Sequence, residues 1–277
     1  MSERAGRPAG RLMRGRWLLA TGLSLVLGMA AAADRAPMTQ PEVVATYPHD
    51  RDAFTQGLVF HGEQLLESTG QRGRSELRWV DLASGRVERR IPLSPRLFGE
   101  GLAITADHRL VQLTWQAGRA LVWSRHGRLL NQWSYRGEGW GLTFDGQALI
   151  RSDGSETLTW HETEDFTPIR RLRVTDGGQP VRRLNELEWV RGHLLANVWQ
   201  TRRIAIIAPE SGRVVEWLDL SHLDANTPAH PGSTLNGIAW LETPQRLFVT
   251  GKRWGTLYEI EVPTRLRRPE RAPQGMP

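Results

Sequence analysis

Residues 54–70 read FTQGLVFHGEQLLESTG, and the fold can be inferred from the pattern that these residues begin. An apolar run that starts at a glycine–leucine pair is followed, across His61 and Gly62, by a second apolar run, and this pattern predicts a β-hairpin. The pattern recurs four times further along the chain, at steps of 44, 40, 45 and 51 residues. The five hairpins open at Gly57-Leu58, Gly101-Leu102, Gly141-Leu142, Glu186-Leu187 and Gly237-Ile238. Recurrence at such a period indicates a repeat architecture.

Two further strand-like segments follow each of the first four hairpins, so each repeat predicts a four-stranded unit. Third strands are expected at 77–80, 120–123, 158–160, 204–207 and 256–260, and fourth strands at 87–91, 129–133, 169–174 and 214–218. The fifth repeat lacks a fourth strand, because the chain after Val262 becomes rich in proline and arginine.

The strand missing from the fifth repeat is found at the other end of the chain. Residues 42–47 precede the first repeat and read as a strand. The predicted fold is therefore all-β: a five-bladed β-propeller with four antiparallel strands per blade, closed by the N-terminal strand joining the last blade. The alternative is a β-sandwich in which the regular spacing of the hairpins is accidental. The five-fold recurrence of both the opening pair and the second apolar run argues against it.

The first 33 residues are expected to lie outside this fold. Five arginines between residues 4 and 16 precede an apolar run at 17–29, and the following Ala31-Ala32-Ala33 offers a cleavage site. This is the pattern of a secretory signal peptide. A retained membrane anchor is the alternative, but the apolar run is shorter than the roughly 20 residues that a membrane span needs. We expect cleavage after Ala33 and a periplasmic or secreted protein.

These patterns divide the chain into a signal peptide at 1–33, a linker at 34–41, a propeller catalytic domain at 42–263 and a loose C-terminal tail at 264–277. The whole chain has a formal net charge of +6, and residues 1–33 carry five Arg and one Glu, so the mature chain is near +2 (+6 minus +4). It has no long basic run. We therefore expect no nucleic-acid partner, no membrane partner after cleavage, and a monomer.

Two residue counts bear on chemistry. The sequence contains no cysteine, which excludes thiol catalysis and thiolate metal sites. Of its 36 basic residues only Lys252 is a lysine. Because the chain uses arginine for every other basic position in this count, we expect its single lysine to lie in a specific environment.

The first strand of each propeller blade lines the central channel, so residues at equivalent positions form rings around the axis. The position before each hairpin's opening pair is occupied by Gln56, Glu100, Trp140, Asn185 and Asn236. A second ring, at the end of the second strands, is Gly70, Trp115, Gly154, Trp199 and Lys252. Such different residues at symmetric positions favour a binding site for an asymmetric ligand. The alternative is a water-filled channel lined by hydrogen-bonding groups, with no binding site.

These motifs resemble the plant and bacterial glutaminyl-peptide cyclotransferases, and the match extends from about residue 42 to residue 262. It is carried by His49-Asp50 and by the segments 53–58, 67–70, 98–102, 139–142, 152–154, 184–188, 197–201, 235–240 and 249–252. The resemblance implies a five-bladed propeller. It also implies metal-independent conversion of N-terminal glutamine to pyroglutamate with release of ammonia, acting on peptides or proteins.

The family's site pattern is matched position by position. The catalytic carboxyl of the family matches Glu100, within Phe98-Gly99-Glu100-Gly101. The pocket aromatics match Phe54, Phe98, Trp115, Trp140 and Trp199, and the polar positions match Gln56, Asn185 and Lys252. The resemblance implies no cofactor for catalysis and no metal in the site. Some relatives hold a structural calcium at the propeller centre, and the sequence leaves that possibility open.

The chemistry assigns a role to two of these residues as a hypothesis. Cyclisation needs a neutral amine, a stabilised oxyanion and a protonated leaving group. A carboxyl such as Glu100 can move the protons, and a compact ammonium such as Lys252 can stabilise the oxyanion. Glu67 and Glu186 are the next carboxyls to consider.

Two other functions remain open from the sequence. One is a calcium-dependent propeller lactonase or other hydrolase, which needs several carboxylate and amide ligands around one metal. The central ring offers a single carboxyl and a cation, which suits a metal poorly. The other is a propeller that binds peptides without catalysis.

Overall fold

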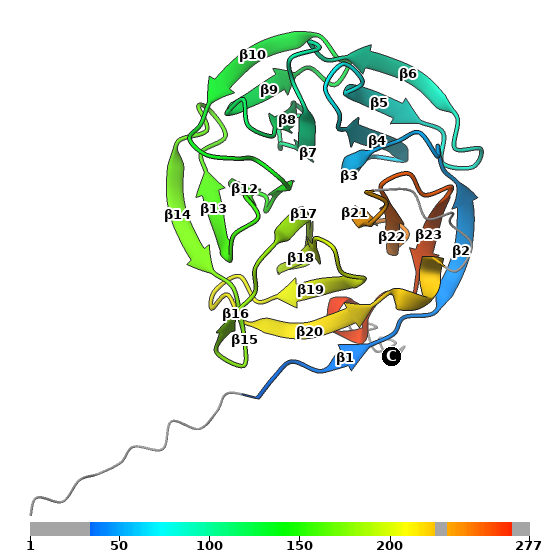
Figure 1. The fold of residues 1–277 in the computed structure, drawn as a ribbon, viewed down its shortest axis with the longest axis vertical. Coiled ribbons are helices and arrows are strands. Elements are labelled where there is room, and N and C mark those ends of the chain that lie inside the picture. The colour runs from blue at the N-terminus through cyan, green and yellow to red at the C-terminus, as the bar shows by residue number, and fades with distance from the viewer. Residues whose placement is uncertain (1–33, 225–231, 268–277) are drawn as a thin grey trace, which may run out of the picture. The chain divides into compact units, whose positions relative to one another are not determined.

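The computed structural model describes residues 34–224 and 232–267. Within these residues, five antiparallel sheets follow one another around a central axis (Figure 1). In each sheet the first strand of the repeat lies innermost, and the next strands are added outward in order. The predicted five-bladed β-propeller is confirmed.

The blades follow the order of the repeats. Blade 1 is β3 (Thr55–His61), β4 (Gln64–Thr69), β5 (Glu76–Val80) and β6 (Val87–Pro92), and blade 2 is β7 (Gly99–Ile104), β8 (Leu110–Thr114), β9 (Arg119–Trp123) and β10 (Leu129–Ser134). Blade 3 is β11 (Leu142–Phe144), β12 (Leu149–Arg151), β13 (Thr157–His161) and β14 (Pro168–Arg173). Blade 4 is β17 (Leu184–Val190), β18 (His193–Val198), β19 (Arg203–Ile207) and β20 (Val214–Asp219). Blade 5 is β21 (Leu235–Leu241), β22 (Arg246–Gly251), β23 (Thr256–Ile260) and β2 (Val43–Pro48).

Strand β2 closes the ring as the outermost strand of blade 5. It pairs antiparallel with β23, with Tyr47 opposite Leu257. The first and last strands of the propeller therefore share one sheet, which ties the two ends of the domain together without a covalent bond.

The two expected flanking segments are more structured than the sequence indicated. Residues 34–41, expected as a linker, contain β1 (Met38–Thr39), which adds a fifth, parallel strand to the outer edge of β20. The expected loose tail begins with a 3-10 helix, η2 (Thr264–Leu266), and Leu266 is buried against the core between blades 4 and 5. The expected signal peptide at 1–33 and residues 268–277 lie outside the described residues.

Three short elements lie outside this pattern. Strands β15 (Thr175–Asp176) and β16 (Gln179–Pro180) form a small hairpin between blades 3 and 4. A second 3-10 helix, η1 (Ser221–Asp224), follows β20.

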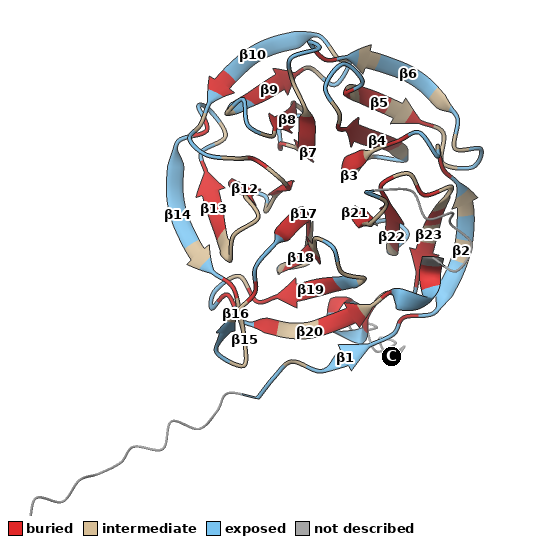
Figure 2. Cartoon of the chain, viewed as in Figure 1, coloured by how far each residue is buried: buried red, intermediate tan, exposed pale blue. Residues whose placement is uncertain are grey.

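The core is divided into five hydrophobic clusters, one at each interface between neighbouring blades. Between blades 5 and 1, for example, Leu58 and Leu65 pack with Ala239, Phe248 and Leu257. Figure 2 shows the result: the inner strands are buried and most of the outer strands β6, β10 and β14 are exposed. In a chain without cysteine, burial of these apolar faces is the main stabilising contribution.

Glycine at the start of the inner strands lets neighbouring blades approach closely. A Cβ on Gly57 would lie 2.5 Å from the backbone nitrogen of Leu102, and a Cβ on Gly141 would lie 2.0 Å from the carbonyl oxygen of Asn185. Both distances are shorter than van der Waals contact. The small residue that defines the repeat is therefore required by the narrow centre of the ring.

Glu186 takes this position in blade 4 and uses its side chain across the channel. Its carboxylate accepts hydrogen bonds from the backbone N–H of Ile238 (2.9 Å) and Leu58 (3.4 Å). Blade 4 is thereby connected to the inner strands of blades 5 and 1. The one departure from the small-residue pattern thus has a structural role in the channel.

A buried polar network reinforces ring closure. His49 directly follows β2. Its Nε2 atom lies 3.2 Å from Glu67 Oε1 in blade 1, and its Nδ1 atom lies 2.7 Å from the carbonyl oxygen of Trp254. Glu67 also accepts a hydrogen bond from Thr55 Oγ1 (2.8 Å), and its Oε2 lies 3.6 Å from Arg78 Nη1. Burial alone would raise the pKa of Glu67, but the charge of His49 and these contacts hold it below the usual value.

We expect Glu67→Gln to lower the free energy of unfolding by about 3 kcal/mol, because one member of a buried charged group is removed. The pKa of Glu67 is lower in the folded protein, so its contribution is present above the unfolded-state pKa and is lost as pH falls through the folded pKa. Urea midpoints measured at several pH values check both points. Glu63→Gln, at an exposed position, should change stability by less than about 0.5 kcal/mol; an equal loss in the two variants would contradict the assignment.

Candidate active site

The inner hairpins share an irregularity that places four polar side chains together. The pairing register shifts between residues 55 and 57, 99 and 102, 184 and 187, and 235 and 238. Gln56, Glu100, Asn185 and Asn236 lie within these bulges. A bulge re-aims a side chain that regular pairing would point to one face of the sheet. The equivalent positions predicted from the repeat therefore do gather at one end of the channel.

All nine predicted site residues line a single cavity of about 280 Å³. They come from the starts of inner strands and the ends of second strands, which lie at the same end of the blades. The floor is polar and nearly inaccessible: Gln56, Glu100 and Lys252 are 4% exposed and Asn185 is 2% exposed. The walls are half-buried aromatic rings, namely Phe54, Phe98, Trp115, Trp140 and Trp199.

The aromatic rings contact one another edge to face around the mouth. Phe98 lies between Phe54 and Trp115, with ring centroids 6.0 and 5.6 Å away, and Trp140 meets Trp199 at 5.6 Å. The glycines of the second ring leave room for them. A Cβ on Gly70 would lie 2.3 Å from the Phe98 ring, and Gly154 faces Trp140 in the same way. These ring contacts and the packing against the glycines hold the aromatic side chains of the cavity wall in place.

A chain of hydrogen bonds orients the carboxyl on the floor. Asn236 Nδ2 donates to Gln56 Oε1 (3.2 Å) and to the carbonyl oxygen of Thr55 (3.0 Å), which fixes the direction of the Gln56 amide. Gln56 Nε2 then donates to Glu100 Oε1 (3.1 Å). Asn236 does not line the cavity, so it acts through Gln56.

Glu100 has the environment of a carboxyl whose protonated form is favoured. Burial raises its pKa well above the ordinary value, the positive charge of Lys252 opposes this, and the negative charge of Glu138 adds to it. A carboxyl with a raised pKa is suited to general acid–base work.

Lys252, the only lysine of the sequence, is the cation of the cavity. Burial lowers its pKa to about 8, against the opposing effect of the Glu100 charge. Its Nζ lies 4.9 Å from the centre of the Phe54 ring. In the part of the chain that the structure describes, no ion pair within 4.0 Å joins it to Glu100, so both groups face the space between them with capacity for further partners.

Asn185 also has unused hydrogen-bonding capacity. Its Oδ1 is buried and has no hydrogen-bond partner among the described residues. The Nδ2 donor of the same amide also has no partner among the described residues but is not buried, so Nδ2 is the atom that reaches the cavity.

Glu138 is a contributor that the sequence reasoning missed. Its Oε2 accepts hydrogen bonds from Trp115 Nε1 (2.7 Å) and Trp140 Nε1 (2.9 Å), and its Oε1 accepts one from Gln116 (3.2 Å). These bonds lower the pKa of Glu138 against the raising effect of burial, so the carboxyl is ionised at neutral pH. Because Glu138 lies in a loop outside the two rings of the repeat, the repeat alignment gave no signal for it.

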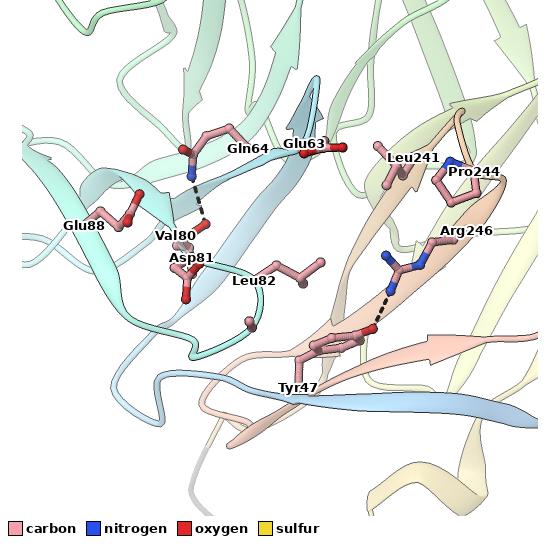
Figure 3. Close-up of a pocket in the computed structure, with 11 residues that line it drawn as sticks. Tyr47, Glu63, Gln64, Val80, Asp81, Leu82, Glu88, Leu241, Pro244 and Arg246 are labelled. Atoms are coloured by element: carbon pink, nitrogen blue, oxygen red, sulfur yellow. Dashed lines mark hydrogen bonds between the residues drawn. The ribbon is translucent and has the colours of Figure 1, made fainter.

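The remaining carboxyls and cavities lie elsewhere. Glu67 is in the closure network and Glu186 in the channel, and neither lines the cavity. Within residues 34–224 and 232–267 no group of three or more His, Cys, Asp and Glu side chains is placed to hold a metal ion. A larger cavity between blades 5 and 1 includes Tyr47 and Arg246 in its lining (Figure 3), and it shares no lining residue with the candidate active site.

Comparison with known proteins agrees with this arrangement. Residues 17–262 match the sequence profile of the glutamine cyclotransferase family. The chain belongs to this family. It is 42% identical over 227 residues to the glutaminyl-peptide cyclotransferase of Arabidopsis thaliana, covering 80% of this chain and 71% of that protein.

A solved structure in the glutamine cyclotransferase family shares the fold. The crystal structure of Myxococcus xanthus glutaminyl cyclase superposes with a TM-score of 0.77 at 37% sequence identity. The match covers 82% of this chain and 97% of that one. Nearly the whole of the Myxococcus chain therefore corresponds to the propeller described above.

Proposed function

We propose that this protein is a glutaminyl-peptide cyclotransferase, which converts the N-terminal glutamine of peptides or proteins to pyroglutamate and releases ammonia. The observation that carries the proposal is the meeting of one carboxyl, one ammonium and two amides on the floor of an aromatic cavity, in a chain of this family. At about 280 Å³ the cavity is near the lower limit of small-ligand pockets, which suits a single terminal residue.

Glu100 moves the protons. Its carboxylate takes a proton from the substrate's α-ammonium, and the neutral amine attacks the side-chain amide carbon of the same residue. A C–N bond forms and the amide oxygen becomes an oxyanion. Glu100 then gives its proton to the amide nitrogen, the C–N bond to that nitrogen breaks, and ammonia leaves. A second proton from the new ring nitrogen passes to Glu100, which releases it to ammonia as ammonium.

Lys252 stabilises the oxyanion. Its ammonium is nearly buried, where a charge acts more strongly than in water. The negative charge on the oxygen exists only after attack, so this interaction favours the transition state over the bound substrate. The aromatic walls exclude water and hold the terminal residue folded back for attack.

The amides support selection of glutamine. Gln56 is held by Asn236 and Glu100, whereas the Asn185 Oδ1 atom is unpaired. The accessible Nδ2 atom of Asn185 donates a hydrogen bond to the oxygen of the substrate's side-chain amide. Asn185 therefore helps to hold the side-chain amide of an N-terminal glutamine in the cavity.

Ammonia release measured with and without a chelator separates this proposal from its rivals. We expect a peptide with N-terminal glutamine to release ammonia at the same rate in both conditions, since no metal or cofactor takes part in the steps above. Chelator-sensitive hydrolysis of esters would indicate a calcium-dependent lactonase. Binding without turnover would indicate a peptide-binding propeller. Either result would overturn the proposal.

Glu138 provides a separate prediction. We expect Glu138→Ala to lower kcat/KM about tenfold or more, because two charge-assisted hydrogen bonds that orient Trp115 and Trp140 are lost. Glu138→Gln keeps an acceptor but removes the charge that raises the pKa of Glu100. The acidic limb of the pH–rate profile, where Glu100 loses its ionised form, should then move to lower pH. An unchanged limb would contradict this electrostatic role.

Export is proposed on the leader sequence at residues 1–33, with a periplasmic or secreted monomer as the product. Among the described residues, no helix has the length and apolar character needed to cross a membrane. Mass analysis of the exported protein tests the proposal, with an N-terminus at Asp34 as the expected result. An intact N-terminus on the exported protein would contradict it.

A further inference from the structure

A further cavity, open at its edge, lies between blades 2 and 3, and Tyr135 and Arg136 from the loop that leads to Glu138 belong to its lining. Its volume, about 290 Å³, is close to that of the candidate active site, and it shares no lining residue with that site. Three arginines line it, Arg136, Arg151 and Arg171, together with the single carboxyl Asp165. The other polar residues of the lining are Ser134, Tyr135, Thr159, His161 and Thr167.

Arg151 is a buried cation without a close counter-charge. The residue is 7% exposed, and its guanidinium donates to two neutral acceptors, the carbonyl oxygen of Glu138 and His161 Nε2 (3.3 Å). It also lies over the Tyr135 ring, 4.9 Å from the centroid. In the described part of the chain, no carboxylate lies within 4.0 Å of it.

The guanidinium is not fully used by these contacts. It carries five N–H donors, of which two are engaged. None of its nitrogen atoms is both buried and unpaired, so the remaining donors reach the cavity. An uncompensated buried charge is costly, and buried charges in native proteins are normally paired.

The surrounding groups make the cavity electropositive. Arg136 and Arg171 are exposed at its edge, and no side-chain partner within the described residues engages either guanidinium. Burial first, then the charges of Arg151 and Arg171, lower the pKa of His161 to about 4, although its bond with Phe166 opposes this. The negative groups nearby are Asp165, at the edge, and Asp153, which acts on Arg151 from beyond 4.0 Å.

We infer that this cavity binds a small oxyanion, a phosphate or a carboxylate, between the guanidiniums of Arg136, Arg151 and Arg171. Such an anion supplies the counter-charge that Arg151 lacks. The planar fork of each guanidinium matches two oxygens of either ligand, and Thr159 in the lining carries a hydroxyl as a further donor. The inference does not depend on the proposed cyclase activity, because the two cavities are separate.

Thermal unfolding in the presence of inorganic phosphate, acetate or chloride at equal ionic strength tests the inference. A ligand that binds only the folded state raises the midpoint as its concentration passes Kd. We expect phosphate or acetate, but not chloride, to raise the midpoint of the wild-type protein. A larger response to phosphate identifies a phosphate site, and a larger response to acetate identifies a carboxylate site. Equal midpoints in the three salts would overturn the inference.

The double variant Arg136→Ala/Arg171→Ala tests the location. It leaves Arg151 in place, because that residue also holds the Glu138 carbonyl oxygen. We expect the anion affinity to fall about tenfold or more for the loss of charge-assisted hydrogen bonds. The matched control is Arg128→Ala/Arg213→Ala, which removes the same charge at exposed positions outside the cavity. Equal losses in the two double variants would show an effect of net charge alone and would overturn the site.

The pKa of His161, measured by NMR, tests anion binding independently. A bound anion stabilises the imidazolium, so phosphate should raise the pKa of His161 from about 4 in the wild type. The shift should be absent in the Arg136→Ala/Arg171→Ala variant. A His161 titration that phosphate leaves unchanged in the wild-type protein would contradict binding at this place.

Discussion

Glu100→Gln is expected to lower kcat by about 10²–10⁴-fold, the range that general acid–base catalysis contributes. The amide has the same shape and can keep the hydrogen bond with Gln56, so the cavity stays intact. It cannot take a proton from the substrate ammonium or give one to the leaving nitrogen. Ammonia release at saturating peptide measures the loss.

The control for Glu100→Gln is Glu210→Gln, an exposed glutamate outside the cavity, which should keep wild-type turnover. Removing a carboxyl whose pKa is raised by burial also removes a destabilising group, so the variant should unfold at or above the wild-type urea midpoint. A folded Glu100→Gln protein with wild-type kcat would contradict the assigned role.

Lys252→Met is expected to lower kcat by about 10²–10³-fold, the cost of removing one oxyanion-stabilising group. Lys252→Arg keeps the charge but places a larger planar group where a compact ammonium is needed. We expect Lys252→Arg to lower kcat more than it raises KM. The reverse pattern, a raised KM with unchanged kcat, would show that Lys252 only binds the ground state.

The pH profile separates the ionisation of Lys252 from that of the substrate amine. Only the protonated lysine stabilises an oxyanion, and its pKa is about 8, so kcat/KM should fall as pH rises through this value. In Lys252→Arg this limb should move to higher pH, because arginine stays charged. A limb that belongs to the substrate amine would be the same in both proteins.

The uniqueness of Lys252 makes its ionisation directly measurable. Apart from the chain's amino terminus, it is the only amine that reductive methylation with ¹³C can label. The titration of its methyl signal should give a pKa near 8 in the wild type. In Glu100→Gln this pKa should be lower, because the carboxylate that favours the ammonium is gone. An ordinary lysine pKa in the wild-type protein would contradict burial of this group.

The repeat made the fold predictable from the sequence. Each glycine–apolar pair marks the place where an inner strand passes the narrow centre of the ring, where a Cβ would clash with the next blade. The N-terminal strand was predictable because the fifth unit lacked one. Strand β1 was not, since Met38–Thr39 pairs with a distant outer strand and carries no periodic pattern of its own.

The same symmetry made seven of the nine cavity residues predictable, because equivalent positions in a propeller share a height and a radius. Phe54 and Phe98 lie outside the two rings and were predicted from the family resemblance instead. The irregular parts of the site were not predictable in this way. Glu138 depends on how one inter-blade connection folds back over two indoles. The repeat placed Asn236 in the first ring, but its role in orienting Gln56 depends on the direction of the Gln56 amide. Both follow from local geometry that is particular to one blade.

A peptide with N-terminal glutamine and the same peptide with an acetylated N-terminus differ in whether the α-amine can act as a nucleophile. In the proposed reaction this amine attacks the side-chain amide in the cavity formed around Glu100 and Lys252. We predict one ammonia and one pyroglutamyl peptide from each free peptide, and neither product from the acetylated one. Release of ammonia from the acetylated peptide would show that water attacks the amide, and would contradict the account.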